Sequence, residues 1–258
     1  MVELIKDIAV KAGQKILEIY NREDFSGIVD FKADNSPLTL ADKESHNVIV
    51  AELEKAFPEI PVLSEEGKDI PYEERKNWTK FWCVDPLDGT KEFIKKNGEF
   101  TVNIALIENN TPVLGVIYAP VPNILYSGVV SKGAQKQEGT DIKDIRVNTK
   151  QKDYVAVGSR SHAAPEEQNF LSKLPVSGLV SVGSSLKFCM VAEGKADVYF
   201  RFGPTMEWDT AAGQAIVEAA GGKVLNEKFQ PFTYNKESLR NGSFYCLAEV
   251  NLDPVVTE

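Results

Sequence analysis

Two aspartates follow a short apolar run in the stretch VDPLDGT, residues 84–90. Asp85 and Asp88 stand three residues apart, with Pro86 between them and Gly89 behind them. Asp, Pro and Gly each favour turns for a backbone reason of their own, so a turn explains part of this pattern. A turn does not require two carboxylates, however, because like charges this close raise each other's pKa. The pairing therefore predicts a positive group between the two side chains.

The spacing excludes three common phosphate or metal motifs. The chain has no GxxxxGK[ST] run and so no P-loop. An EF-hand loop needs an oxygen ligand at its third position, and counting from Asp85 that position is Leu87. Aspartyl-phosphate enzymes of the DxDxT kind carry their aspartates two apart, whereas these are three apart.

More carboxylates stand just past the ends of apolar runs. Glu65 follows PVLS, and Asp209 lies in MEWDTAAG. Hard cations such as Mg²⁺ prefer oxygen ligands of this kind. Taken singly, Asp209 also fits the N-cap of the helix that follows, and Glu65 fits a solvated loop. Taken with Asp85 and Asp88, they favour a metal site.

The same loop also predicts an anion site. Gly89 permits close approach of the backbone to a ligand, and the amides of Gly89 and Thr90 would open a helix in TKEFIKK, residues 90–96. Free amides at a helix N-terminus suit a phosphate. Metal carboxylates beside such amides indicate a metal-assisted phosphoesterase.

The whole chain limits the possible partners. Its 258 residues predict one large domain, with halves of about 1–150 and 151–258 that form a site between them. The net charge of −9 and the lack of a Lys/Arg-rich run argue against nucleic-acid binding. An anionic substrate would be repelled overall, so local cations must attract it.

The cysteines and the N-terminus indicate a cytoplasmic protein. Cys83, Cys189 and Cys246 lie in apolar contexts, as reduced buried thiols do, and with His46 and His162 as the only histidines a zinc site is not expected. Residues 1–20 show helical apolar spacing interrupted by charges, which is typical of an amphipathic helix rather than a signal peptide. No apolar run has the length of a membrane span.

Periodicity predicts an α/β protein of layered type. Helices are expected over residues 1–20 and about 39–57. Strands with antiparallel pairing are expected at 81–84, 100–108, 113–120 and 123–130. Beyond residue 150, strands at 154–159, 179–183, 197–202 and 222–226 alternate with helical segments.

The strings DPLDGTKEF (85–93) and EWDTAAGQAIVEAAGG (207–222) resemble the paired signatures of the inositol monophosphatase superfamily of Mg²⁺-dependent, lithium-sensitive phosphatases. Strings along nearly the whole chain match as well, including PVLSEEG, NGEFTVNIALIE and GSSLKFCMVAEGKADVYFRFGPT. They are most similar to the bacterial 3'(2'),5'-bisphosphate nucleotidases. The resemblance implies an αβαβα sandwich fold and two or three Mg²⁺ ions per site.

The resemblance also implies roles for individual residues. Glu65, Asp85 and the carbonyl of Leu87 look like ligands of the first metal, and Asp85, Asp88 and Asp209 like ligands of the second. Thr90 and Asp42 resemble the pair that orients and deprotonates the attacking water. That role would replace the capping box that Thr39 and Asp42 otherwise fit.

Substrate choice depends on residues outside the metal cluster. Inositol-specific members carry a glutamate where this chain has Phe202, which argues against inositol. Ser184, Lys187 and Arg201 match the substrate contacts of the bisphosphate nucleotidases, although Lys187 also fits an exposed helix residue and Arg201 an edge-strand charge. The full set of implied substrate contacts is Glu65, Leu87, Asp88, Gly89, Thr90, His162, Gly183, Ser184, Lys187, Arg201 and Asp209.

These features together predict an enzyme that hydrolyses the 3'-phosphate of adenosine 3',5'-bisphosphate (PAP) to AMP, and also PAPS to adenosine phosphosulfate. The partner is a small nucleotide, with no nucleic-acid polymer and no integral membrane contact. The resemblance also admits a peripheral place on the inner membrane. An inositol or fructose phosphate phosphatase and a non-catalytic metal- or nucleotide-binding relative are the alternatives. The oligomeric state stays open.

Overall fold

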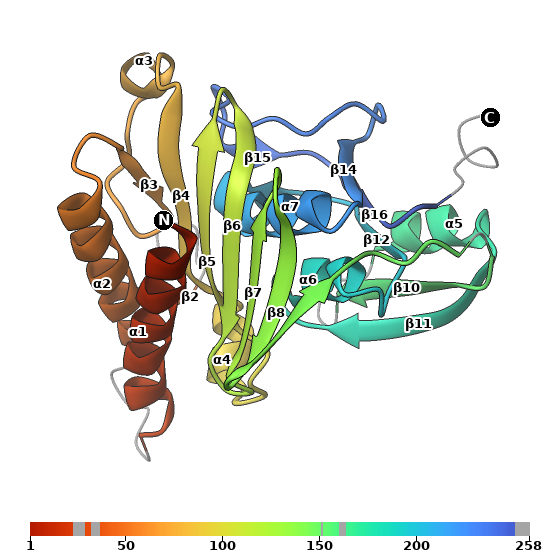
Figure 1. Cartoon of the computed structure of the whole chain (residues 1–258), viewed down its shortest axis with the longest axis horizontal. Coiled ribbons are helices and arrows are strands. Elements are labelled where there is room, and N and C mark those ends of the chain that lie inside the picture. The colour runs from red at the N-terminus through yellow and green to blue at the C-terminus, as the bar shows by residue number, and fades with distance from the viewer. Residues whose placement is uncertain (23–28, 32–36, 151, 160–163, 251–258) are drawn as a thin grey trace.

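The computed structural model describes residues 1–22, 29–31, 37–150, 152–159 and 164–250, and Figure 1 draws the remaining residues as a thin grey trace. Five layers follow one another across the molecule (Figure 1). Helices α1 (Val2–Tyr20) and α2 (Leu40–Ala56) cover one face of a seven-stranded sheet. Helices α6 (Leu186–Ala192) and α7 (Glu207–Ala219) separate that sheet from a five-stranded one, and α5 (Pro165–Ser172) packs beyond it. The predicted αβαβα sandwich is confirmed.

The seven-stranded sheet is an antiparallel meander extended by one parallel strand. Its order is β3-β4-β5-β6-β7-β8-β9, and only β3 and β4 run parallel. The predicted antiparallel strands are confirmed. Between β5 and β6, Asn109 and Asn110 have positive φ and form the tight turn that antiparallel pairing needs. The strands are β3 (Val62–Ser64), β4 (Lys80–Asp88), β5 (Thr101–Glu108), β6 (Thr111–Ala119), β7 (Ile124–Val129), β8 (Gly133–Glu138) and β9 (Asp141–Ile145).

Strand β4 continues past Val84, where the apolar run stops, and this corrects the expectation that the aspartates lie beyond the strand. Asp85 pairs with Asn103 and Asp88 with Thr101, so the register shifts between the two pairs. Such an extra residue re-aims side chains, as bulges beside active sites do. Both carboxylates are therefore held by the sheet itself.

The five-stranded sheet is mixed, with the order β11-β10-β12-β16-β14. Strand β10 pairs in parallel with β11 and β12, and β16 pairs antiparallel with β12 and β14. The predicted alternation of strands and helices after residue 150 is confirmed. The strands are β10 (Tyr154–Ser159), β11 (Val176–Val182), β12 (Val198–Arg201), β14 (Lys223–Asn226) and β16 (Phe244–Leu247). Short elements complete the described chain: β1 (Val29–Phe31), β2 (Pro37–Thr39), α3 (Tyr72–Arg75), α4 (Thr90–Ile94), β13 (Thr205–Met206) and β15 (Arg240–Asn241).

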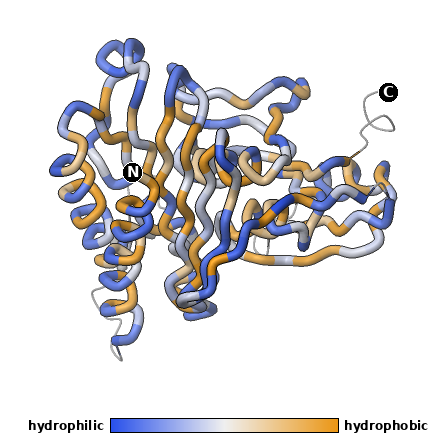
Figure 2. The backbone as a smooth tube through the Cα atoms, in the orientation of Figure 1, coloured by the Kyte–Doolittle hydropathy of each residue, from blue (hydrophilic) through white to orange (hydrophobic). Residues whose placement is uncertain are grey.

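Strand β4 is buried on both faces, and its side chains alternate between two clusters of the hydrophobic core. Trp82 and Val84 pack in the cluster under α1 and α2, whereas Phe81 and Cys83 pack in the cluster between the two sheets. Figure 2 shows hydrophobic residues running along the central strands and the inner helix faces. Because side chains on a strand alternate, Asp85 continues the row of Phe81 and Cys83 and faces the middle helices.

Two glycines let helix α7 lie directly on the seven-stranded sheet. A Cβ at Gly115 would fall 2.3 Å from the carbonyl oxygen of Ala212, and one at Gly128 would fall 2.7 Å from Cα of Ile216. Larger residues would push the helix away from the sheet. The close approach places the first turn of α7 near the bulged end of β4.

All three cysteines are free and buried, as predicted. None of the described helices is long and apolar enough to cross a membrane.

Candidate active site

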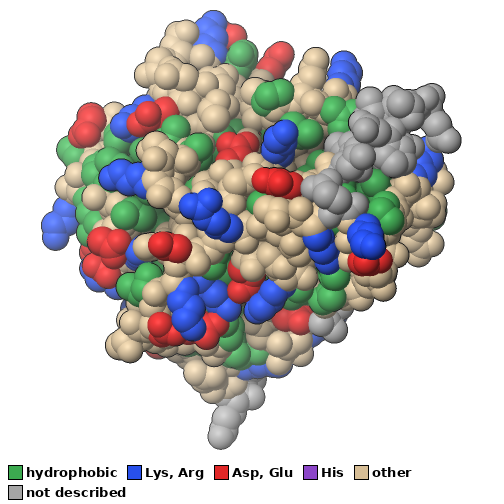
Figure 3. All heavy atoms as spheres, turned by 45° about the vertical axis from the view of Figure 1, so that its right-hand side comes forward, with side chains coloured by type: hydrophobic (Ala, Val, Ile, Leu, Met, Phe, Trp, Pro, Cys, Tyr) green, Lys and Arg blue, Asp and Glu red, His purple; other side chains and the backbone are tan. Residues whose placement is uncertain are grey.

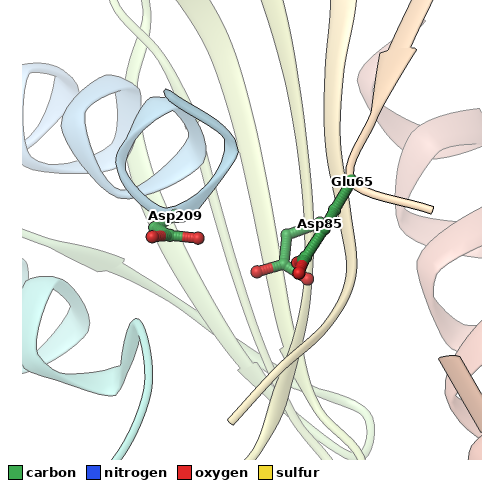
Figure 4. A group of neighbouring side chains, drawn as sticks. All are labelled: Glu65, Asp85 and Asp209. Carbon is green, nitrogen blue, oxygen red and sulfur yellow. The ribbon is translucent and has the colours of Figure 1, made fainter. Parts of the chain in front are cut away.

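Three carboxylates from three separate elements converge at one point. Glu65 follows β3, Asp85 lies in β4, and Asp209 lies in the first turn of α7 (Figure 4). Each offers an oxygen atom, and these atoms lie within 4.8 Å of one another. The parallel pairing of β3 with β4 brings the first two together, since Glu65 N–H donates to Val84 O at 3.1 Å.

The cluster concentrates negative charge in a buried place. Burial raises the pKa of Asp85 well above its usual range, and the charges of Glu65 and Asp88 raise it further. Burial likewise raises the pKa of Asp209, with Asp88 adding to the effect. Such a group of oxygen donors needs a compensating cation, and the donor set matches hard divalent ions.

The pKa of Asp88 is set by opposing effects. Burial raises its pKa to about 6, while the Lys187 ammonium and the Ser185 N–H stabilise its charged form. Leu87 is buried, and its N–H donates to Oδ1 of Asp85 at 3.0 Å. The residues predicted to bind metal therefore lie in one cluster or directly beside it.

Asp42 serves two partners through its two oxygens. Its Oδ1 accepts from Thr90 Oγ1 at 3.2 Å, and its Oδ2 accepts from Thr39 N at 2.8 Å and from Thr39 Oγ1. The expectation that pairing with Thr90 replaces the capping box of Thr39 and Asp42 is thus wrong, because the structure contains both. The cap fixes the Asp42 side chain at the start of α2, where it meets Thr90 at the start of α4.

Asp209 does not cap its helix from the N-cap position. Helix α7 begins at Glu207, two residues before it, and the Asp209 carboxylate accepts from Met206 N at 2.7 Å. The first turn of the helix thereby orients the carboxylate that faces Glu65 and Asp85 (Figure 4).

A cavity of about 280 Å³ opens beside the carboxylates. Its walls come from two parts of the chain, residues 65–92 and residues 183–244. The first part includes β4 of the seven-stranded sheet, and the second includes α6, α7 and strands β12 and β16 of the five-stranded sheet. It collects most of the predicted substrate contacts: Glu65, Asp88, Gly89, Thr90, Gly183, Ser184, Lys187, Arg201 and Asp209. Leu87 is buried and does not line the cavity, and His162 is outside the described residues.

Neither of the two cations predicted to bind substrate is an ordinary surface charge. Lys187 is buried in the first turn of α6, and its Nζ donates to Ser184 O at 2.6 Å. Burial lowers its pKa, and the Asp88 charge opposes that effect. Arg201 ends β12, which lies between β10 and β16 and is not an edge strand. The alternatives of an exposed helix residue and an edge-strand charge are both wrong.

Sequence reasoning missed the other residues that line the cavity, among them the aromatic residues Tyr199 and Phe244. Tyr199 could have been found, because it stands two residues before Arg201 on the same strand and so shares its face. Phe244 pairs across from Arg201 on β16, a contact that only the sheet order provides.

We expect metal-free protein to lose stability relative to Asp88→Asn as the pH rises through about 6. The folded pKa of Asp88 lies above its usual value of 3.8, so protonation stabilises the native state. This contribution is complete below about pH 4 and is lost as the pH rises through the folded pKa. Because Asp88 borders the cavity and keeps some contact with water, the difference should reach roughly 1–3 kcal/mol.

Urea unfolding in EDTA at pH 5 and pH 7.5 measures this difference. Adding Mg²⁺ at pH 7.5 should reverse its sign, since the metal requires the carboxylate. A difference that is independent of pH would show that Asp88 carries no unfavourable charge in the metal-free protein.

Comparison with known proteins gives a consistent result. A family model described as the inositol monophosphatase family matches residues 1–253. The 3'(2'),5'-bisphosphate nucleotidase CysQ of Escherichia coli K12 is 48% identical over 246 residues, which are 95% of this chain and 98% of that protein. The corresponding CysQ of Buchnera aphidicola is 44% identical over 251 residues, which are 96% of this chain and 94% of that protein. The crystal structure of CysQ from Bacteroides thetaiotaomicron superposes with a TM-score of 0.84 at 48% identity, covering 96% of this chain and 97% of that one.

Proposed function

The chain belongs to the inositol monophosphatase family, and from this we propose that it hydrolyses the 3'-phosphate of PAP to AMP and phosphate with Mg²⁺. The observation that carries the proposal is the joining of two sites in one cavity. Glu65, Asp88 and Asp209 line it with carboxylate oxygens, and Lys187 and Arg201 line the same cavity with cations. A nucleotide with two phosphates needs both features.

The carboxylates divide between two metal positions in this proposal. Glu65, Asp85 and the Leu87 carbonyl would hold one ion, and Asp85, Asp88 and Asp209 would hold the other. When bound, Mg²⁺ supplies a Lewis acid that stabilises the charge developing on the phosphoryl oxygens. The raised pKa of Asp85 and Asp209 supports this assignment, because burial and the neighbouring carboxylates disfavour their charged forms and a bound cation would compensate for both.

Thr90 and Asp42 handle the attacking water. The Thr90 hydroxyl donates its proton to Asp42, so its oxygen is free to accept a hydrogen bond from water and to aim it at phosphorus. As the water oxygen bonds to phosphorus, its proton passes through Thr90 to the Asp42 carboxylate. The bond from phosphorus to the 3'-oxygen breaks, and that oxygen takes up a proton from solvent water. No strong nucleophile stands among these residues, so direct attack by water is favoured over a covalent intermediate.

The remaining 5'-phosphate is assigned to Lys187, Arg201 and Ser184. PAPS carries a phosphate at the same 3' position, and its hydrolysis to adenosine phosphosulfate follows from the same geometry. Phe202 stands where inositol-specific members carry a glutamate, and its backbone N–H is taken by Glu167 at 3.1 Å. A hydrophobic side chain there offers nothing to sugar hydroxyls, so the inositol alternative is disfavoured.

The surface supports a small substrate rather than a nucleic-acid polymer. On the face that Figure 3 shows, Lys and Arg side chains are interspersed with Asp and Glu and form no continuous basic strip. Phosphate release from PAP, PAPS, inositol phosphate and fructose bisphosphate, each with Mg²⁺ or EDTA, tests the assignment. The proposal requires the highest kcat/KM on PAP with Mg²⁺ and no phosphate release in EDTA. A preference for inositol phosphate would refute the nucleotide assignment, and no turnover at all would favour a non-catalytic relative.

Arg201→Ala should lower kcat/KM for PAP about ten- to a hundredfold and scarcely change it for a simple monophosphate such as p-nitrophenyl phosphate. A charged hydrogen bond to the second phosphate is worth roughly 1.5–3 kcal/mol, and a monophosphate has no second phosphate to bind. Arg146 is exposed and lies outside this cavity, so Arg146→Ala is the matched control. Equal losses on both substrates would assign Arg201 to the fold or the metal site instead.

A further inference from the structure

One tyrosine in the wall of the cavity carries a hydroxyl that the fold does not use. Phe188, Tyr199 and Phe244 are the aromatic residues that line the cavity, and of these Tyr199 alone has a polar group on its ring. Only 4% of Tyr199 is exposed. Its phenol oxygen makes no hydrogen bond within the described part of the chain, yet it is not sealed in the core. The hydroxyl is therefore the part of Tyr199 that borders the cavity.

Aromatic packing holds the Tyr199 ring from two sides. The ring of Phe188 lies 5.3 Å from it between centroids at an angle of 83°, and the ring of Phe244 lies 5.3 Å from it at 89°. Alternation along β12 places Tyr199 on the same face of the strand as Arg201. A donor that is already held in place loses little conformational entropy when it binds a ligand. The hydroxyl is thus preorganised beside the Arg201 side chain.

The second cation of the cavity lies over the same ring. Nζ of Lys187 is 5.5 Å from the centroid of the Tyr199 ring. A lysine has three N–H donors, and Lys187 directs two of them to Ser184 O at 2.6 Å and to Val182 O at 3.4 Å. One N–H is left for a ligand. Lys187 therefore attracts an anion by its charge but can donate only one hydrogen bond to it.

A phenol beside two cations suits a phosphate oxygen. Burial raises the pKa of Tyr199, so the hydroxyl keeps its proton and acts as a donor at neutral pH. A hydrogen bond from a neutral donor to an ionised phosphate is about twice as strong as one between neutral groups. The charges of Lys187 and Arg201 favour an anion over a neutral acceptor at this place.

We propose that Tyr199 is a specificity-determining residue whose hydroxyl donates to the phosphate that is not cleaved, beside Lys187 and Arg201. The inference rests on the proposed function, which assigns the 5'-phosphate of the nucleotide to this part of the cavity. Tyr199 makes and breaks no covalent bond in this assignment. Its contact is with a group remote from the reacting phosphorus, so it stabilises the bound substrate and the transition state equally and lowers KM.

Tyr199→Phe removes the hydroxyl and keeps the ring and its packing. It should lower kcat/KM for PAP about ten- to a hundredfold, mainly through a higher KM, as expected for the loss of one hydrogen bond to a charged group. Adenosine 3'-monophosphate has the same base, sugar and cleaved phosphate but no 5'-phosphate, so its kcat/KM should scarcely change. Equal losses on the two substrates, or no loss on either, would overturn the proposal.

Tyr245→Phe is the matched control. Tyr245 follows Phe244 on β16, but its ring packs with Phe170 and Phe200 in a different cluster of the core and does not line the cavity. This variant loses the same hydroxyl from the same sheet and should keep the kcat/KM of both substrates. Thermal unfolding of both variants shows that the comparison is made between folded proteins.

Binding of AMP tests Tyr199 without turnover, because AMP keeps the 5'-phosphate and has no 3'-phosphate to hydrolyse. Calorimetry in EDTA, where the uncompensated carboxylates repel a phosphate, directs the 5'-phosphate of AMP to the two cations. Tyr199→Phe should weaken AMP binding about ten- to a hundredfold and leave adenosine binding unchanged.

The two measurements separate the inference from the proposed function. Weaker AMP binding in Tyr199→Phe, with no hydrolysis of PAP by the unaltered protein, would refute the proposed function and support the role of Tyr199. Hydrolysis of PAP together with unchanged AMP binding in Tyr199→Phe would refute the inference alone. A protein that neither hydrolyses PAP nor binds AMP more tightly than adenosine would refute both.

Discussion

Asp85→Asn should lower kcat/KM for PAP by at least about a thousandfold at saturating Mg²⁺. Asp85 is the one carboxylate assigned to both metal positions, and the substitution keeps its shape while removing its charge. Charge stabilisation of this kind contributes several kcal/mol, and about 1.4 kcal/mol corresponds to a factor of ten in rate. Phosphate release measured over a range of Mg²⁺ concentrations separates weaker metal binding from a slower reaction.

The same variant should be at least as stable as the unaltered protein when metal is absent at pH 7. Burial and the neighbouring carboxylates raise the pKa of Asp85, so its charged form is unfavourable in the folded state. Asp197→Asn is the matched control, because Asp197 is equally buried but accepts from Val155 N and pairs with Lys150 away from the cavity. It should lose stability and keep its activity per folded molecule. Near-normal turnover in Asp85→Asn would contradict the metal assignment.

Asp42→Asn should lower kcat for PAP about a hundred- to ten-thousandfold and leave KM little changed. Asparagine can still accept from Thr39 N, so the start of α2 is retained, but it cannot take the proton that Thr90 passes on. Steady-state kinetics at saturating Mg²⁺ give the split between kcat and KM, and thermal unfolding checks the cap.

Substitutions at Thr90 provide the internal control for that result. Thr90→Ser keeps the hydroxyl that donates to Asp42 at 3.2 Å and should keep most of the activity. Thr90→Val removes the hydroxyl and should lose about as much as Asp42→Asn, because the two residues act as one unit. If Thr90→Val and Asp42→Asn multiplied their losses when combined, the two residues would act independently.

Local sequence determined the elements and the chemistry of the ligands. Helical spacing predicted α1 and α2 within one or two residues, and alternation with turn residues predicted the hairpins β5–β6 and β6–β7. Strands β3, β8 and β9 of the same sheet were not predicted. These signals are local, since each depends on residues within one or two turns of the chain. The types and positions of Glu65, Asp85, Asp88 and Asp209 indicated a metal site because carboxylates beside apolar runs have few other uses in such number.

Tertiary structure decided where those groups meet and how they are held. The bulge of β4 depends on its pairing with β5, and the approach of Asp209 depends on the contact of α7 with Gly115 and Gly128. Lys187 could be read as a surface residue from its sequence, but the packing of α6 between two sheets buries it.

The hydrogen-bond partners of Asp42 and Ser185 could not be predicted from the sequence either. Asp42 binds Thr90, 48 residues away, and Ser185 binds Asn103, 82 residues away. No periodicity links residues at such separations, because only the stacking of layers brings them together. From the sequence, the capping box and the contact with Thr90 compete for the Asp42 side chain. In the structure one oxygen of Asp42 accepts from Thr39 and the other accepts from Thr90.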